Sequence, residues 1–147
     1  MSEANRRNLR DALLSSTVAL PAAAATANHS SFDIGDGPHR ERMSVIVECP
    51  ATASLVDAKD IYFELEHSTD DSTFTDVGDV LETSGSAATV EGSIIATVTG
   101  DGGDGAPAVV FELPIPQNAN RYIRVSQSVE AAGGDNTGVS ATVYLNS

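Results

Sequence analysis

The chain has 147 residues, of which 21 are acidic and 8 are basic, giving a formal net charge of −13. A body this acidic repels phosphate backbones and anionic lipid, so the composition argues against nucleic-acid and membrane partners. The length suits one domain with its own core, and the single cysteine, Cys49, excludes an intramolecular disulfide. Cys49 ends an alternating apolar run, so we expect a buried thiol and not a nucleophile. Ser15 and Pro21 interrupt the apolar segment that follows the basic start, so we expect no secretion signal.

Residues 1–31 differ in composition from the rest of the chain. They contain no aromatic residue, a predicted short helix over 5–15 and a stretch rich in alanine and threonine. Because so little apolar bulk cannot form a core, the segment is either a floppy tail or an arm that orders on a partner. The arm interpretation assigns partner contact to its charged and apolar side chains, which are Arg6, Arg7, Leu9, Arg10, Leu13, Leu14, Val18 and Leu20.

From residue 32 onward the sequence predicts short strands separated by turns. The clearest alternation is 61–67, where Ile61, Phe63 and Leu65 share one inward face. The glutamates of opposite parity predict a solvated face, since acid–base catalysis needs carboxyls whose pKa values are split by burial. Other strands are predicted at 43–49, 74–77, 80–81, 88–90, 92–99 and 109–113.

The last two predicted strands, 121–126 and 139–145, flank a loop rich in glycine, asparagine and aspartate. Two half-buried strands joined by such a loop predict a hairpin. About eight antiparallel strands therefore predict an all-β domain over 32–147, a β-sandwich or jelly roll, preceded by the extended N-terminal arm. Tyr62 and Tyr144 alternate with the apolar residues of their strands, so we expect them on the outward side. They are the predicted contact residues of this body, because interfaces are enriched in tyrosine.

The loop 100–105 is the stretch that most resembles a ligand loop. Its Asp101 and Asp104 lie among glycines, but the spacing and trailing glutamate of an EF-hand are missing. We therefore expect a flexible turn and keep these two aspartates only as the alternative, a calcium site. His29, His39 and His67 stand at no metal-ligand spacing, and no nucleophile–base pair is visible. The sequence predicts no cofactor and no enzymatic activity.

Several short motifs follow one another in an order found in a known group of proteins. They are Asp11-Ala12-Leu13-Leu14, Phe32-Asp33-Ile34-Gly35, the run from Ile61 to Phe74, Leu113-Pro114, the run from Asn120 to Val125, and Thr137-Gly138-Val139-Ser140-Ala141. Together they resemble the capsid cement, or decoration, proteins of tailed bacteriophages, and the similarity spans nearly the whole chain.

This resemblance implies a structural virion protein, made in the host cytoplasm and added to the outside of an icosahedral shell. The implied partner is the major capsid protein, with this chain bound as a trimer or dimer that cements neighbouring capsomers. Residues 1–20 would then be needed for capsid binding but not for folding of the body. Two alternatives stay open, namely an extracellular adhesin-like module that binds carbohydrate or calcium, and another virion protein of a tail or fibre.

Overall fold

The computed structural model describes residues 14–35, 43–77, 94–103, 105–116 and 118–146. These residues form ten strands and no helix, so the predicted all-β class is confirmed. The strands are β1 (Ser15–Ala19), β2 (Thr26–Asn28), β3 (Phe32–Asp33), β4 (Ser44–Cys49), β5 (Asp60–Ser68), β6 (Thr75–Asp76), β7 (Ile94–Thr99), β8 (Val109–Pro114), β9 (Tyr122–Val129) and β10 (Ser140–Asn146). The strand segments predicted at 80–81 and 88–90 lie outside the described residues.

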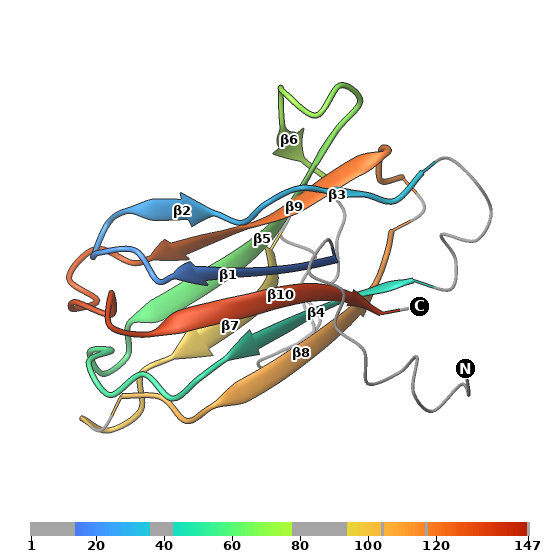
Figure 1. Ribbon diagram of the computed structural model, residues 1–147. Coiled ribbons are helices and arrows are strands. Elements are labelled where there is room, and N and C mark those ends of the chain that lie inside the picture. Colours follow the sequence, from blue (N-terminus) through green and yellow to red (C-terminus); the bar gives the residue numbers. More distant parts are fainter. Residues whose placement is uncertain (1–13, 36–42, 78–93, 104, 117, 147) are drawn as a thin grey trace, which may run out of the picture.

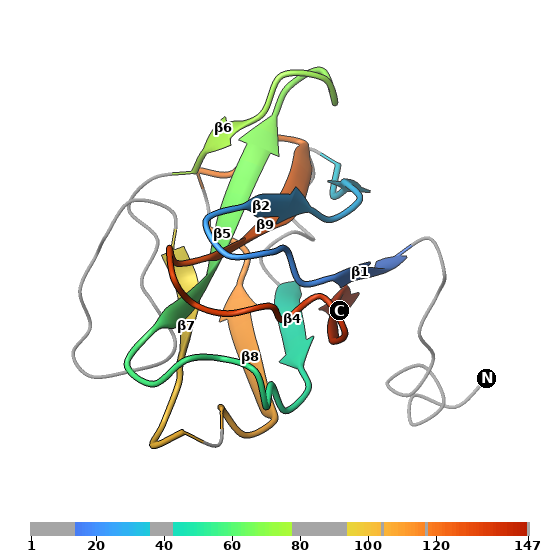
Figure 2. The ribbon, with the colours of Figure 1, turned by 90° about the vertical axis from the view of Figure 1, so that its left-hand side faces the viewer.

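Two antiparallel sheets pack against each other (Figures 1 and 2). Sheet A has the order β1-β10-β4-β8. Sheet B centres on β9 and β5, with β2 and β3 beside β9 and with β6 and β7 beside β5. The outermost strands in sequence pair with each other, and the pairing continues inward along the chain. β1 pairs with β10, β2 and β3 pair with β9, β4 pairs with β8, and β5 pairs with β6 and β7. This nested order is that of a jelly roll, as predicted.

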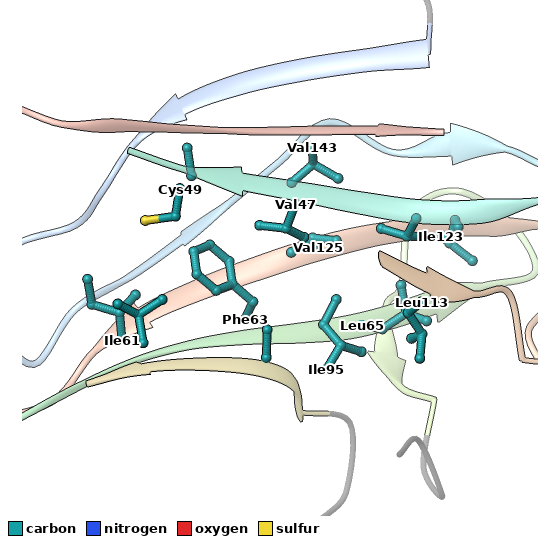
Figure 3. Close-up of a cluster of buried hydrophobic side chains, with 14 of the residues drawn as sticks. Val47, Cys49, Ile61, Phe63, Leu65, Ile95, Leu113, Ile123, Val125 and Val143 are labelled. Atoms are coloured by element: carbon teal, nitrogen blue, oxygen red, sulfur yellow. The ribbon is translucent and has the colours of Figure 1, made fainter. Parts of the chain in front are cut away.

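The core lies between the sheets and is built by alternation along each strand. In β5, Ile61, Phe63 and Leu65 point inward and are fully buried, as the sequence predicted. Figure 3 shows Phe63 pointing into the same space as Val47 of β4 and Val125 of β9. Removing these side chains from water is the main stabilising term, at about 25 cal/mol per Å² of apolar surface.

The turn after β5 depends on one aspartate. Asp70 Oδ1 accepts hydrogen bonds from the backbone N–H groups of Ser72 and Thr73, each at 3.0 Å, and from the Ser68 hydroxyl at 2.7 Å. These bonds, the one from Thr73 first, lower the pKa of Asp70 to about 2. Capping of backbone N–H groups by a nearby aspartate side chain is typical of such turns.

The predicted C-terminal hairpin is wrong. β9 pairs with strands of sheet B, and β10 pairs with β1 and β4 in sheet A. The connection between β9 and β10 crosses from one sheet to the other. Gly133 lies in this connection, and its carbonyl accepts a hydrogen bond from the Val56 N–H at 3.1 Å. Alternation and turn residues look the same whether the next strand returns to the same sheet or crosses to the opposite one.

The structure also moves the predicted boundary between arm and body. Within the predicted arm of residues 1–31, β1 pairs with β10 from Ser15 opposite Tyr144 to Ala19 opposite Ser140, and β2 pairs with β9. The body therefore begins no later than residue 15, not at residue 32. Of the helix predicted over 5–15, Ser15 is in a strand, and residues 5–13 lie outside the described ones.

We predict that deleting residues 1–20 destabilises the body, contrary to the expectation from sequence. The deletion removes β1 and Leu20, which is 1% exposed, and losing a buried leucine side chain alone costs about 2–5 kcal/mol. Urea unfolding followed by circular dichroism should show a lower midpoint. The matched control, deletion of residues 1–13, removes no described strand and should keep the full-length midpoint. Equal midpoints for both truncations would contradict the role of β1.

Candidate interaction surface

The outer side of sheet A is a continuous surface crossed by four strands. We call it the sheet A face. Its residues have the outward parity of their strands, although Ser44 and Ile46 of β4 are themselves buried. They are Ser15, Thr17, Ala19, Ser44, Ile46, Glu48, Val110, Glu112, Pro114, Ser140, Thr142, Tyr144 and Asn146. Figure 1 shows the four strands side by side. Most of these side chains are hydroxyl-bearing, amide or aliphatic, and none is basic.

Hydrogen bonds on the sheet A face tie its polar groups to one another. The hydroxyls of Thr17 and Thr142 are 2.9 Å apart across β1 and β10. Both carboxylates of the face accept a hydrogen bond, Glu48 from the Tyr144 hydroxyl at 3.0 Å and Glu112 from the Ser44 hydroxyl at 2.8 Å. Each carboxylate therefore has a partner in place but keeps its charge, so the face carries two negative charges among mostly uncharged side chains.

An apolar side chain stands at the edge of the same face. Val110 in β8 is 65% exposed, the most exposed large hydrophobic residue in the part of the chain that the structure describes. It lies across from Glu48 of β4 in the same cross-strand row as Thr17 and Thr142. Single exposed aliphatic residues are common on protein surfaces, so the small number of charged side chains on this face is the feature that favours protein contact.

The outer side of sheet B, the sheet B face, is also acidic and carries more charged side chains than the sheet A face. Its strands carry five outward carboxylates, which are those of Asp33, Asp60, Glu64, Glu66 and Asp76. Burial raises the pKa of Glu64, and the neighbouring carboxylates of Asp76 and Glu66 raise it further. Arg124 offsets part of this charge, because its Nε lies 2.9 Å from Glu66 Oε1 and its guanidinium lies 4.2 Å from the centre of the Phe74 ring. We therefore expect this face to be solvated.

The two predicted contact tyrosines lie on different faces. Tyr144 belongs to the sheet A face, and Tyr62 points outward from β5 on the sheet B face. Both are half-buried, and the Tyr62 hydroxyl donates to Asp60 at 3.1 Å. They cannot belong to one flat contact surface, because the whole sandwich separates them.

Three predicted arm residues instead belong to the body. Leu20 lies in the core, Leu14 packs against the core, and Val18 is half-buried in β1. Their apolar character serves the fold, so the partner contact assigned to them from sequence is wrong for Leu20 and unsupported for the other two. The remaining predicted residues, Arg6, Arg7, Leu9, Arg10 and Leu13, lie outside the described residues.

A buried polar network that the sequence did not reveal joins the two sheets at β1. His29 is 3% exposed, with Nδ1 3.1 Å from the Ser16 hydroxyl of β1 and Nε2 2.8 Å from Gln127 Oε1 of β9. Gln127 Nε2 donates to the backbone carbonyls of Val18 at 3.2 Å and Ala19 at 2.9 Å. The network therefore ties the edge strand of sheet A to a central strand of sheet B.

The geometry fixes the protonation of this histidine. Because the Gln127 amide group donates to two carbonyls, its oxygen faces His29, and Nε2 must carry the proton. Nδ1 is then the acceptor of the Ser16 hydroxyl, whose oxygen accepts from the Ser30 N–H at 3.1 Å. Burial lowers the pKa of His29, and the hydrogen bonds to Gln127 and Ser16 oppose this only in part. His29 is neutral in the folded protein at neutral pH.

The alternative calcium site gains no support from the loop geometry. Asp101 is exposed, and Asp104 lies outside the described residues. Nearby, Asp57 Oδ1 accepts from the Gly102 N–H at 2.8 Å, so this carboxylate already ties the loop to a segment 45 residues earlier in the chain. No group of three or more histidine, cysteine, aspartate or glutamate residues within the described ranges could hold a metal ion.

The other singled-out residues have structural partners or are buried. His67 Nδ1 accepts from the Asn120 N–H at 3.1 Å, so this histidine near the end of β5 has a structural partner. Cys49 is 1% exposed, and burial raises the pKa of its thiol to about 11, so it is not a thiolate at neutral pH. His39 lies outside the described residues.

Comparison of the sequence with protein-family models and with curated proteins finds no match. The described residues include no helix long and apolar enough to cross a membrane.

We predict that His29 makes stability depend on pH. Its pKa is lower in the folded than in the unfolded state, so the unfolded state binds more protons and stability is lost as pH falls below about 6.5. The His29→Gln variant should be less stable by about 1–3 kcal/mol at neutral pH, because it disrupts a buried network. Urea midpoints of the two proteins should converge between about pH 7.5 and about pH 5.5, a window above most carboxylate titrations.

The control is His67→Gln, which removes a half-buried histidine outside this network. Its midpoint over the same pH window shows what the loss of a histidine outside the network does. A constant difference between wild type and His29→Gln over the whole window would show that the network does not titrate in the folded state.

Proposed function

We propose that the protein is a structural virion protein that binds the outer surface of a phage capsid and cements neighbouring capsomers. The motifs that carry the resemblance support this, because several of them converge in sheet B. The run from Ile61 forms β5, the run from Asn120 leads into β9, and these strands pair along their length. Phe32, in another motif, pairs with Ile123 of β9. Residues far apart in sequence thus belong to one structural unit.

The observation that carries the proposal is the sheet A face. It presents mostly hydroxyl and aliphatic side chains, with Glu48 and Glu112 as its charged residues, on a body whose net charge is −13. A packed two-sheet body that offers such a surface adds contact area between subunits without any chemistry. The sheet B face, with its five carboxylates, then points to solvent.

The proposed partner is the major capsid protein, with this chain bound as a dimer or trimer on the shell exterior. Because residues 15–31 contribute strands to the body, the proposed capsid-binding arm becomes residues 1–13. Within it, Arg6, Arg7 and Arg10 would contact an acidic rim, and Leu9 and Leu13 an apolar groove. Ordering these residues costs on the order of 1–2 kcal/mol each, so the arm must bury apolar surface or add strands to bind.

Co-sedimentation with empty shells of the phage that encodes the chain tests both parts of this proposal. We expect the full-length protein to pellet with the shells at saturating occupancy. The truncation lacking residues 1–13 should bind at least about tenfold more weakly while remaining folded, since it loses the arm contacts. A charge-matched variant with lysine at positions 6, 7 and 10 should bind like the wild type.

Two outcomes separate the parts. If the full-length protein stays in the supernatant with shells at any concentration, the capsid function is overturned. If the truncation binds as well as the full chain, only the assignment of the arm fails, and the body alone would carry the contact.

A further inference from the structure

Beyond the proposed capsid function, we infer that the outer edge of β8 binds an extended, basic segment of another protein, which joins sheet A as an added strand. β8 is the last strand of this sheet, with β4 as its neighbour on one side (Figure 1). On the other side of β8, no strand of the described residues pairs with it. This edge lies in the plane of the sheet, so an added strand lies beside the sheet A face and not on it.

The pairing register shows which backbone groups of β8 point to this edge. Ile115 N–H donates to the Met43 carbonyl at 3.0 Å, in the same register that pairs β8 with β4. In an antiparallel pair, the backbone groups of alternate residues point to the partner strand. The odd-numbered residues of β8 therefore bond to β4, and the N–H and C=O groups of Val110 and Glu112 point away from it.

The backbone groups of Val110 and Glu112 form a short row of alternating donors and acceptors. Within the described ranges, no other residue supplies a hydrogen-bond partner to these groups. Pro114, at the next outward position, has no N–H, so the donors of the row end at Glu112. Such a row is complementary to the backbone of an extended segment, which is the basis of recognition by strand addition.

Apolar side chains at the same edge are incompletely covered. Val110 is 65% exposed on the outer side of the sheet. On the inner side, Val109 and Phe111 are only partly buried, whereas Val47, opposite Phe111 on β4, is 1% exposed. Phe111 contacts Phe63 of sheet B, with ring centres 6.5 Å apart. An added strand with apolar residues on its inner side would cover the remaining surface of Val109 and Phe111.

The other edges of the two sheets are less suited to strand addition. β1, at the opposite edge of sheet A, is rich in serine and threonine, and its Ala19 carbonyl already accepts from Gln127 Nε2 at 2.9 Å. In sheet B, β2, β3 and β6 have only two or three residues each. Ile95 and Thr97 of β7 already make further interactions.

Charge selects the kind of segment that fits β8. The strands of sheet A carry two carboxylates, Glu48 and Glu112, and no basic residue. Glu112 is exposed on β8 itself, and its hydrogen bond from the Ser44 hydroxyl leaves its charge in place. Opposite charges at facing positions of neighbouring strands stabilise a sheet, and like charges destabilise it. A lysine or arginine opposite Glu112 is therefore favoured, and the net charge of −13 attracts a basic segment to the body.

Two capped synthetic peptides, each long enough to span β8, are the probes for this edge. The first alternates valine with lysine, so that its valines can cover Phe111 while its lysines lie on the side of Glu112. The second alternates valine with glutamate and has the same spacing of apolar residues. The two peptides separate the contribution of charge from that of strand pairing.

Proline substitutions provide a matched pair of variants. Val110→Pro removes an outward N–H but no bond to β4, a change that an edge strand tolerates. Thr17→Pro does the same at the opposite edge of sheet A. The bond from Leu20 N–H to the Val139 carbonyl, at 2.8 Å, sets the register of β1 in which Thr17 N–H points away from β10.

Fluorescence anisotropy of the labelled peptides, titrated with the full chain, measures binding. We expect the wild type to bind the lysine peptide, and to bind the glutamate peptide at least about tenfold more weakly. Val110→Pro should weaken binding of the lysine peptide at least about tenfold, and Thr17→Pro should leave it unchanged. Saturation of the wild type with the lysine peptide should also slow hydrogen exchange at the amides of Val110 and Glu112.

Circular dichroism first confirms that each variant is folded. If Val110→Pro does not fold, Glu112→Lys tests the same edge with an unchanged backbone and should narrow the difference between the two peptides. Equal affinity of the lysine peptide for the wild type and Val110→Pro, or unchanged exchange at Val110 and Glu112, overturns the inference. Absence of binding at millimolar peptide overturns it as well. No capsid shell enters these measurements, so this inference and the capsid proposal succeed or fail separately.

Discussion

The apolar contact between the inner faces of the two sheets is the interaction on which the rest of this structure depends. The strands of both sheets are short, and a pair of such strands alone is only marginally stable in water. They persist because side chains such as Phe63 in sheet B and Val143 in sheet A exclude water from the space between them. Since the inner faces supply the stability, the outer faces are free to differ, and one can carry five carboxylates while the other carries hydroxyls.

Alternation along the sequence predicted most strands and their inward faces. The run at Ile61, Phe63 and Leu65 shows why this works, since a period of two directly reflects the pleat of a half-buried strand. The same signal cannot say to which sheet a strand belongs, because both sheets bury one face in the same core. That is why the hairpin of β9 and β10 was predicted wrongly, and why Tyr62 and Tyr144 lie on opposite sides of the molecule.

The N-terminal strands escaped prediction for a different reason. The inward position Ser16 of β1 and the buried His29 after β2 are polar, so no apolar stripe marks these segments. Turns were hidden too, because Ala24, with a φ of 62°, adopts a left-handed conformation that usually signals glycine. The His29 network joins residues up to 109 positions apart in sequence, a coupling that no local pattern encodes.

The pairing of β1 with β10 has a consequence for folding during synthesis. Thr17 and its partner Thr142 are separated by 125 positions, so the first described strand leaves the ribosome long before the strand that completes its sheet exists. Until then, inner-face side chains of the nascent chain stay uncovered, a state prone to aggregation. Mutual repulsion between acidic chains on one messenger would keep these unfinished copies apart, so the negative charge opposes aggregation during synthesis as well as in the folded protein.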